Sequence, residues 1–288
     1  TMTKRKTRAN FQPKITKAQI HKQVADQVIE AMTTAGTDWV KNWSVPKAMQ
    51  PTSLSTGKQY NGINWLILSM RKASRGYRTS EWATFQQWKK LGASVKKGEK
   101  STLVVLYKTV QIKDKETEET QHIPMMKHFR VFNADQVEGY EPVIPEDSFA
   151  DLPATEADKV ATLAGATVKN GDAARAYYAP KQDFINMPFQ AQFDSPEGYA
   201  CTLLHELTHW TGHKSRLDRD AKTGFGTKDY AFEELVAELG AAMLAGSLGI
   251  CAEPRDDHAK YLNSWIKVLK DDPQVIFKAA AKANQAAQ

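Results

Sequence analysis

The most constraining feature of the sequence is a pair of histidines, His205 and His209, within a long segment of helical periodicity. This segment, residues 195–211, opens with the helix-start signal Ser-Pro, which predicts a helix over its whole length. Residues i and i+4 lie on one helix face, so both imidazoles can bind one metal ion, with Glu206 beside them to hold a metal-bound water. The fold therefore has to bring a third ligand to this helix.

Two positions can supply the third ligand. A second helix, predicted over residues 230–248, carries Glu234 and Glu238 one turn apart, so one carboxylate can bind the metal while the other orients a ligand histidine. We expect Glu234 to be the ligand and Glu238 to lie behind a histidine. The alternative ligand is His213. Two histidines and a glutamate are typical zinc ligands, and manganese is the alternative ion.

Such a centre is suited to peptide hydrolysis. Three protein ligands leave a fourth position for a water whose pKa zinc lowers to about 7, and Glu206 is the base expected to remove its proton. We therefore expect a metallopeptidase with Glu206 as the catalytic residue. The predicted strand at residues 184–187 is expected at the rim of the cleft, paired with an extended substrate. Tyr177, Tyr178 or a histidine are candidates for stabilising the oxyanion.

Charge is distributed unevenly along the 288 residues. Residues 1–110 contain 20 Lys and Arg against 5 Asp and Glu, whereas residues 111–288 contain 19 against 28, so net charges of +15 and −9 make up the total of +6. Five of the seven tryptophans also fall in the basic part. Cations neutralise phosphates and aromatic faces stack on unpaired bases, so this part is expected to bind single-stranded DNA. The expected contact residues are Trp39, Lys41, Trp43, Lys58, Tyr60, Arg71, Lys72, Arg75 and Arg78.

Local patterns predict an α+β protein of two domains. In residues 1–138, an α+β domain, we expect helices at 15–32, 64–72 and 81–91, then strands at 103–107 and 127–132 around an acidic loop. Trp82, Phe85, Trp88 and Leu91 are expected to form the buried face of the third helix. Residues 139–154 have the composition of a linker. Residues 155–288 are predicted to be mainly helical, with helices at 155–166, 195–211, 230–248, 257–270 and 275–287 and short strands at 176–178 and 184–187.

The remaining composition narrows the class of protein. No apolar run approaches the roughly 18 to 20 residues of a membrane-spanning helix, and the basic start, residues 1–8, is not followed by an apolar segment. We expect a cytoplasmic protein without a membrane partner. Only two cysteines occur, Cys201 and Cys251, which we expect to be reduced and buried.

The chain as a whole resembles the ArdC-type antirestriction proteins of conjugative plasmids. The resemblance covers nearly all residues and rests on segments 60–65, 82–88 and 98–100, on LLHELTHWTGHKSRLDR at 203–219 and on YAFEELVAELGAA at 230–242. It implies an N-terminal single-stranded-DNA-binding domain joined to a zincin-like metallopeptidase domain, and protection of incoming plasmid DNA from restriction. Glu234 with the small residue Ala237 three positions later also resembles the gluzincin branch of zinc peptidases.

Two other functions fit the same residues. In one, the protein binds and masks DNA, and its metal site is structural or a catalytic relic. In the other, it is a protease of the Spartan type, which acts on proteins crosslinked to DNA. Substitution of Glu206 distinguishes a DNA-masking protein from a peptidase. Only the identity of the substrate distinguishes a Spartan-type protease from an antirestriction peptidase. The sequence identifies neither the protein substrate nor an oligomeric state.

Overall fold

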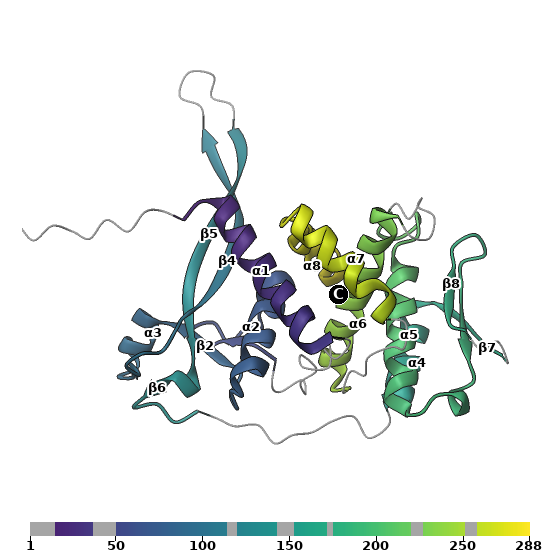
Figure 1. Ribbon diagram of the computed structural model, residues 1–288, viewed down its shortest axis with the longest axis horizontal. Coiled ribbons are helices and arrows are strands. Elements are labelled where there is room, and N and C mark those ends of the chain that lie inside the picture. The colour runs from purple at the N-terminus through teal and green to yellow at the C-terminus, as the bar shows by residue number, and fades with distance from the viewer. Residues whose placement is uncertain are drawn as a thin grey trace, which may run out of the picture.

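The structure is a computed structural model that describes residues 15–36, 50–113, 120–142, 153–171, 175–219, 227–250 and 258–288. Figure 1 shows two mixed regions separated by helices. We call residues up to 142 the N-terminal part and residues from 153 the C-terminal part. Most of the expected linker, residues 143–152, lies outside the described residues, so the domain boundary stays a prediction. The acidic loop 114–119 and Cys251 lie outside them as well, whereas Cys201 is a buried free thiol.

The N-terminal part consists of a four-stranded sheet with helices around it. Its strands follow the order β1-β2-β5-β4, in which only β1 and β2 are parallel. Strands β4 and β5 form a long hairpin with Thr102 opposite Val131 and Lys113 opposite Thr120. The elements are α1 (Lys17–Ala35), β1 (Thr52–Ser53), α2 (Gly62–Arg75), β2 (Glu81–Thr84), α3 (Phe85–Lys90), β3 (Ser94–Val95), β4 (Thr102–Lys113), β5 (Thr120–Asn133), the 3-10 helix η4 (Ala134–Gln136) and β6 (Val137–Glu138).

The C-terminal part is mainly helical, with one small sheet of order β7-β9-β8. Strand β7 is parallel to β9, and β8 is antiparallel to it. The elements are α4 (Pro153–Ala164), β7 (Thr167–Gly171), β8 (Tyr177–Ala179), β9 (Phe184–Pro188), the 3-10 helix η5 (Gln190–Gln192), α5 (Pro196–Thr211), α6 (Lys228–Leu248), α7 (His258–Asp271) and α8 (Val275–Ala286). The α+β prediction is therefore confirmed, although the pattern did not predict β7.

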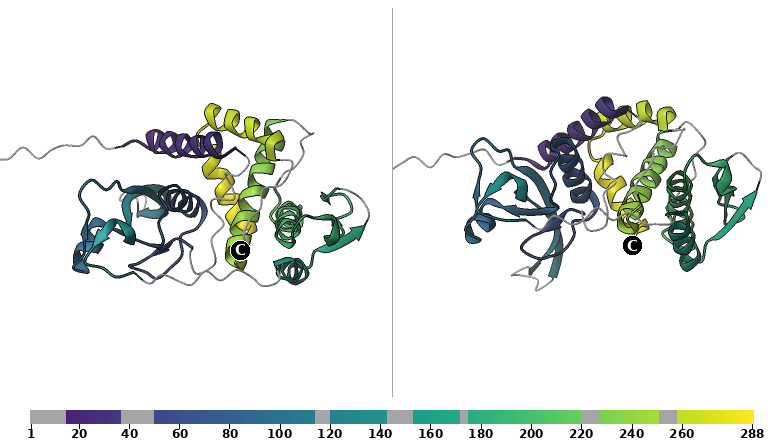
Figure 2. Two further views of the ribbon diagram at one scale, coloured as in Figure 1. Left: turned by 60° about the horizontal axis from the view of Figure 1, so that its bottom comes forward. Right: turned by 90° about the horizontal axis from the view of Figure 1, so that it is seen from below.

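One hydrophobic core runs through both parts. Trp65 of α2 and Leu103 of β4 belong to the same buried cluster as Leu235 of α6 and Ala280 of α8. Helix α8 contacts both α2 and α6, and α1 contacts α7. Figure 2 shows α6 and α8 between the sheet of the N-terminal part and that of the C-terminal part. Among the described residues, no helix is both long and hydrophobic enough to cross a bilayer.

The predicted helix over residues 81–91 is wrong in its first turn. Residues 81–84 form β2, where Trp82 pairs with Asn133 of β5, and α3 begins only at Phe85. Thr84 sets this boundary through a capping box, in which its hydroxyl accepts from the backbone N–H of Gln87 and the Gln87 side chain accepts from the N–H of Thr84. Trp82 and Trp88 are buried as expected, but Phe85 and Leu91 are 51% and 53% exposed. The three-residue spacing from Trp82 to Leu91 begins in a strand and continues in a helix, so these residues do not lie on one face of a single helix.

Candidate metal centre

Helix α5 crosses the middle of the C-terminal part with few of its side chains in solvent. Its start is fixed by Ser195, whose hydroxyl accepts from the backbone N–H of Gly198 at 2.9 Å, and by Pro196 in the first turn. Helices α4 and α6 and strands β8 and β9 contact α5. As a result His205 and Glu206 are only 2% and 4% exposed. A buried helix of this kind holds its polar side chains in fixed directions.

Helix α6 supplies the opposite wall of the site. Thr227 caps it by accepting from the backbone N–H of Tyr230 at 3.2 Å, and Gly249 ends it in the left-handed conformation at φ 72°. Gly240 determines how closely α6 approaches α5, because a Cβ atom there would lie 2.5 Å from Cγ2 of the buried Thr208. The absence of a side chain at residue 240 therefore lets the two helices pack at close range.

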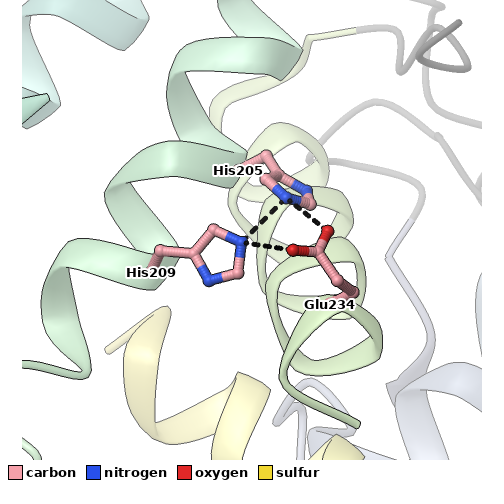
Figure 3. A group of neighbouring side chains, drawn as sticks. All are labelled: His205, His209 and Glu234. Carbon is pink, nitrogen blue, oxygen red and sulfur yellow. Dashed lines mark hydrogen bonds and ion pairs between the residues drawn. The ribbon is translucent and has the colours of Figure 1, made fainter. Parts of the chain in front are cut away.

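His205, His209 and Glu234 converge between these two helices. Figure 3 shows both imidazoles of α5 turned toward the carboxylate of α6. The two Nε2 atoms are 3.1 Å apart, and each lies 3.5 Å from a different oxygen of Glu234. Among the described residues, this is the one group of three or more His, Cys, Asp or Glu side chains with the proximity that a metal site requires.

The spacing of these atoms fits a tetrahedral metal ion. Ligands about 2.05 Å from a tetrahedral zinc are about 3.3 Å from one another, close to the 3.1 and 3.5 Å separations here. Two Nε2 lone pairs that face each other at 3.1 Å also repel unless a proton or a cation lies between them. Two imidazoles and one carboxylate are a common zinc donor set. The residues present therefore fit a divalent metal ion.

Each histidine has a second glutamate of α6 behind it. Nδ1 of His205 lies 3.4 Å from Oε2 of Glu238, and Nδ1 of His209 lies 3.5 Å from Oε1 of Glu233. Nδ1 of His205 makes no hydrogen bond at this distance, so Glu238 acts on it as a nearby charge. A carboxylate beside Nδ1 favours the tautomer with its proton on that nitrogen, which leaves the Nε2 lone pair free for a metal ion. Glu238 was expected behind a histidine, and its carboxylate lies beside Nδ1 of His205; its role at a metal site stays a prediction. Glu233 was missed, because only residues on the face of Glu234 were considered for this role.

Arg219 fixes the position of Glu233. Its guanidinium is buried, lies 2.9 Å from Oε1 of Glu233, and donates at 2.8 Å to the hydroxyl of Thr211. It also donates to the backbone carbonyl of Thr208 in the last turns of α5. Arg219 thus connects the end of α5 to the glutamate of α6 behind His209. No periodic pattern surrounds this residue, so the sequence did not indicate its role.

The carboxylates around His209 control its protonation. Burial by itself lowers the pKa of His209, but hydrogen bonds to Glu233 and Glu234 and the charges of Glu234 and Glu206 outweigh it and raise the pKa to about 10. Burial likewise raises the pKa of Glu234, but hydrogen bonds to His205 and His209 outweigh it and lower the pKa overall. The site is electrostatically suited to a positive charge between these groups.

The other expected site residues lie around this group. Glu206 is on α5 beside His205, but its carboxylate is not one of the three converging groups. Nδ1 of His213 lies 2.7 Å from the hydroxyl of Ser215, and His213 is not in the group either. Tyr178 donates to Asp183 at 2.8 Å, and Tyr177 is 40% exposed. A role for either tyrosine in catalysis stays a prediction.

The expected pairing of a substrate with residues 184–187 is wrong. These residues form most of β9, the central strand of its sheet, so Phe184, Ile185 and Asn186 each pair with β7 on one side and β8 on the other. The backbone hydrogen bonds that a substrate would need are already used. The three-residue strand β8 is one of the two edge strands instead.

The structure separates the residues expected to bind DNA. Trp39, Lys41 and Trp43 lie outside the described residues, Lys58 and Arg75 are exposed, and Arg71 is partly exposed. Tyr60 is partly buried and packs against a small cluster that contains Trp82, and burial raises its pKa. Lys72 is 4% exposed, so we remove it from the expected contacts. The exposed Arg78 donates to Asp135 at 2.9 Å.

Comparisons with known proteins match both parts of the chain. Residues 18–132 match the family described as the N-terminal domain of anti-restriction factor ArdC, and residues 155–282 match the family described as zincin-like metallopeptidase. The crystal structure of the antirestriction protein ArdC from plasmid R388, in its metal-free form, is 40% identical, with a TM-score of 0.77 over 93% of this chain and 95% of that one. This chain belongs to the ArdC antirestriction family. A zincin-like metallopeptidase domain therefore forms its C-terminal part.

Further relatives also match nearly the whole of this chain. The Mn(II)-bound structure of the R388 protein is 43% identical, with a TM-score of 0.76 over the same shares of the two chains. An uncharacterised protein of Sinorhizobium fredii, y4eC, is 35% identical over 94% of this chain and 91% of its own length. Two Escherichia coli proteins named DNA primase TraC are 37% and 36% identical, but this chain spans only 27% and 20% of their lengths.

Proposed function

We propose that this protein is an antirestriction protein that binds single-stranded DNA through its basic N-terminal part and hydrolyses a peptide bond at the metal centre of its C-terminal part. In this way it protects incoming conjugative plasmid DNA from restriction in the recipient cell. The convergence of His205, His209 and Glu234 beside Glu206, in a chain of the ArdC family, is the observation that supports this proposal most directly.

The roles of the residues follow from their positions. His205, His209 and Glu234 would hold the metal ion, which when bound supplies a water of lowered pKa and polarises the scissile carbonyl. Glu206 accepts the proton of that water and passes it to the leaving amine. Its burial at 4% exposure keeps competing water away from its carboxylate. Glu233 and Glu238 hold the rings of the two histidines.

We favour zinc as the metal ion. Two imidazoles and one carboxylate suit zinc, and a zinc ion binds such donors more tightly than manganese does. The Mn(II)-bound structure of the R388 protein supports manganese as the alternative for this chain.

The substitution Glu206→Gln tests the peptidase. The protein would be loaded with zinc or manganese and incubated with unfolded proteins, with and without single-stranded DNA, and cleavage would be followed by mass spectrometry. We expect Glu206→Gln to reduce cleavage by about 100- to 10,000-fold while metal content and DNA affinity stay within twofold of the unaltered protein. Glu197→Gln, the same change in the first turn of the same helix, serves as the matched control.

The outcomes separate the three functions. Full metal occupancy with no cleavage in any condition, together with restriction protection that survives Glu206→Gln, would replace the peptidase with a DNA-masking protein. Cleavage that depends on Glu206 but is confined to proteins crosslinked to DNA would assign the protein to repair of crosslinks instead of antirestriction.

A further inference from the structure

The β4/β5 hairpin has a face of apolar side chains in solvent. Figure 1 shows the hairpin running past α1 and projecting beyond the neighbouring helices. Leu106 is 45% exposed, Met125 is 38% exposed and Phe129 is 42% exposed. Large apolar side chains scattered singly on a surface need no explanation, but a group of them on one element indicates an interaction site.

The register of the hairpin places these three side chains on one face. Residues directly opposite each other in an antiparallel pair point the same way, and alternate residues of a strand share a face. Leu106 is opposite Lys127, and Lys108 is opposite Met125. Phe129 lies two residues after Lys127, so it shares their face. The hairpin face made of Leu106, Lys108, Met125, Lys127 and Phe129 is named the outer face below.

The outer face lies on the side of the hairpin opposite to the side that meets α1. The reverse side of the hairpin carries Tyr107, whose hydroxyl lies 3.4 Å from Nε2 of His21 in α1. The next residue of β4 on that reverse side, Val105, belongs to the central core. On the outer side, the next residue of β4, Val104, is likewise buried, in a cluster with Leu68 and Trp82. Beyond it, both lysines and all three apolar residues of the outer face are exposed. The described neighbours therefore leave this face open.

The charge of the hairpin strands has one sign. Strands β4 and β5 contain the four cations Lys108, Lys113, Lys127 and Arg130 and no Asp or Glu. Two of these cations, Lys108 and Lys127, alternate with the apolar side chains of the outer face. An apolar protein partner would need only the apolar side chains of this face. An unpaired nucleic acid strand would use both kinds of side chain, with the apolar ones against its bases and the cations against its phosphates.

We propose that the outer face is a contact surface for single-stranded DNA, in which bases stack on Phe129 and Leu106 while Lys108 and Lys127 neutralise phosphates. This inference rests on the proposed DNA-binding function and replaces part of the contact set expected from the sequence. The missed signal was the alternation of apolar and basic residues along the two strands on either side of the acidic loop 114–119, because these strands themselves contain no Asp or Glu.

The test measures binding of a fluorescein-labelled oligo-dT to the full chain by anisotropy over a range of salt concentrations. We expect Phe129→Ala to weaken binding about fivefold or more, and Phe129→Tyr, which keeps the aromatic ring, to leave it within twofold. The matched control is Phe189→Ala, since Phe189 is 44% exposed but belongs to the C-terminal part.

A double substitution tests the phosphate contacts. This test does not depend on whether the Phe129→Ala variant folds. Lys108→Ala with Lys127→Ala should lower the slope of log affinity against log salt by about 1.4, or 0.7 for each phosphate contact of a single strand. The control removes two exposed lysines of α3, with Lys89→Ala and Lys90→Ala, and should change the slope less.

The outcomes separate this inference from the function on which it rests. A wild-type chain that does not bind the oligonucleotide contradicts the proposed DNA-binding function. A chain that binds, with unchanged affinity and slope in all hairpin variants, contradicts the outer face alone. Self-association of the wild type that Leu106→Ser removes without changing DNA affinity would assign the outer face to a second copy of the chain and overturn the proposal.

Discussion

Glu233 is held from two sides, by His209 of α5 and by the buried guanidinium of Arg219. An isolated carboxylate at 15% side-chain exposure would gain a proton or rotate toward water, but the ion pair with Arg219 keeps it charged and fixed. Hydrogen bonds from His209 and Arg219 offset burial and lower the pKa of Glu233. The orientation of the His209 ring therefore depends on Arg219, a residue outside the converging group of His205, His209 and Glu234.

Replacing Arg219 should weaken metal binding without removing a ligand. Arg219→Lys keeps the charge but loses the planar fork that reaches Glu233, Thr211 and the carbonyl of Thr208 together. We expect zinc affinity to fall, but by less than the roughly 10- to 100-fold that is typical when the partner of a ligand histidine is itself lost, because Glu233 remains. Competition with a chromophoric chelator measures this affinity.

Arg216 provides the control for this experiment. It donates to the carbonyl of Trp210 at 2.7 Å and pairs with Asp183, so it also holds the end of α5. Arg216→Lys should leave zinc affinity within about threefold. An equal loss in both variants would mean that the end of α5, and not the orientation of His209 by Glu233, sets the affinity.

The individual site residues were predictable to different degrees. His205, Glu206 and His209 follow from local helix geometry, because four residues always bring two side chains to one face. Glu234 needed a second helix and a guess about how the two pack. Arg219 was not predictable, since it follows α5 in an irregular segment and only tertiary packing brings it to Glu233.

The contact between helices α5 and α6 sets the geometry of the site. The three candidate ligands are on two separate elements, so an increase in the distance between the helices moves Glu234 away from both histidines. The distance between the helices is limited at Gly240 of α6, where the side chain of Thr208 leaves no room for a Cβ atom.

Gly240→Ala should therefore affect stability and metal binding together. The added methyl group would lie 2.5 Å from Thr208 Cγ2 and 2.8 Å from its Oγ1, and Thr208 is fully buried, so either this side chain or the two helices must shift. We expect a loss of about 1–3 kcal/mol in the free energy of unfolding, as for other overpacked cores, and weaker zinc binding. Urea unfolding measures the first and chelator competition the second.

A companion variant tests the mechanism. In Gly240→Ala with Thr208→Ser, the smaller side chain removes the methyl group that the new Cβ would meet at 2.5 Å. Part of both losses should be recovered, because the serine hydroxyl still lies near the position of Oγ1, 2.8 Å from the new Cβ. If the double variant is no better than Gly240→Ala alone, close packing at this point is not what positions Glu234.

Element boundaries show where local patterns fail. The helices of the C-terminal part could be predicted because their apolar periodicity extends over many turns. Residues 81–91 could not, because the choice between strand and helix at Trp82 depends on pairing with Asn133, some fifty residues further along the chain. The long hairpin strands were underestimated for the same reason.

At the scale of the whole molecule, the N-terminal and C-terminal parts share the main hydrophobic core, and two smaller clusters lie within the N-terminal part. Trp65 is 4% exposed in this core, and its indole N–H donates to the side chain of Gln50. The Gln50 amide in turn lies against Gly246 of α6, where a Cβ atom would be 2.5 Å from its nitrogen. The helix that carries Glu234 is thus in contact with the basic part of the chain.

Loss of the Trp65 side chain should destabilise both parts at once. A Trp→Ala change in a core costs about 3–5 kcal/mol, and a shared core spreads that loss to the metal centre. We expect Trp65→Ala to lower the urea midpoint of tryptophan fluorescence and the midpoint of metal release by the same amount. Leu163→Ala, at a residue 87% exposed on α4, is the control. A metal-release midpoint that stays unchanged would show that the two parts unfold separately.

The packing of α2 against α8 also has a consequence for synthesis of the chain. About 200 residues separate Arg75 at the end of α2 from Val275 at the start of α8. At translation rates of roughly 5–20 residues per second, the apolar side of α2 exists for about 10 to 40 s before its partner has been made. For that interval the basic half of the nascent polypeptide has to stay soluble with an unfinished core, so its native packing is completed only when the ribosome has nearly reached the end of this sequence.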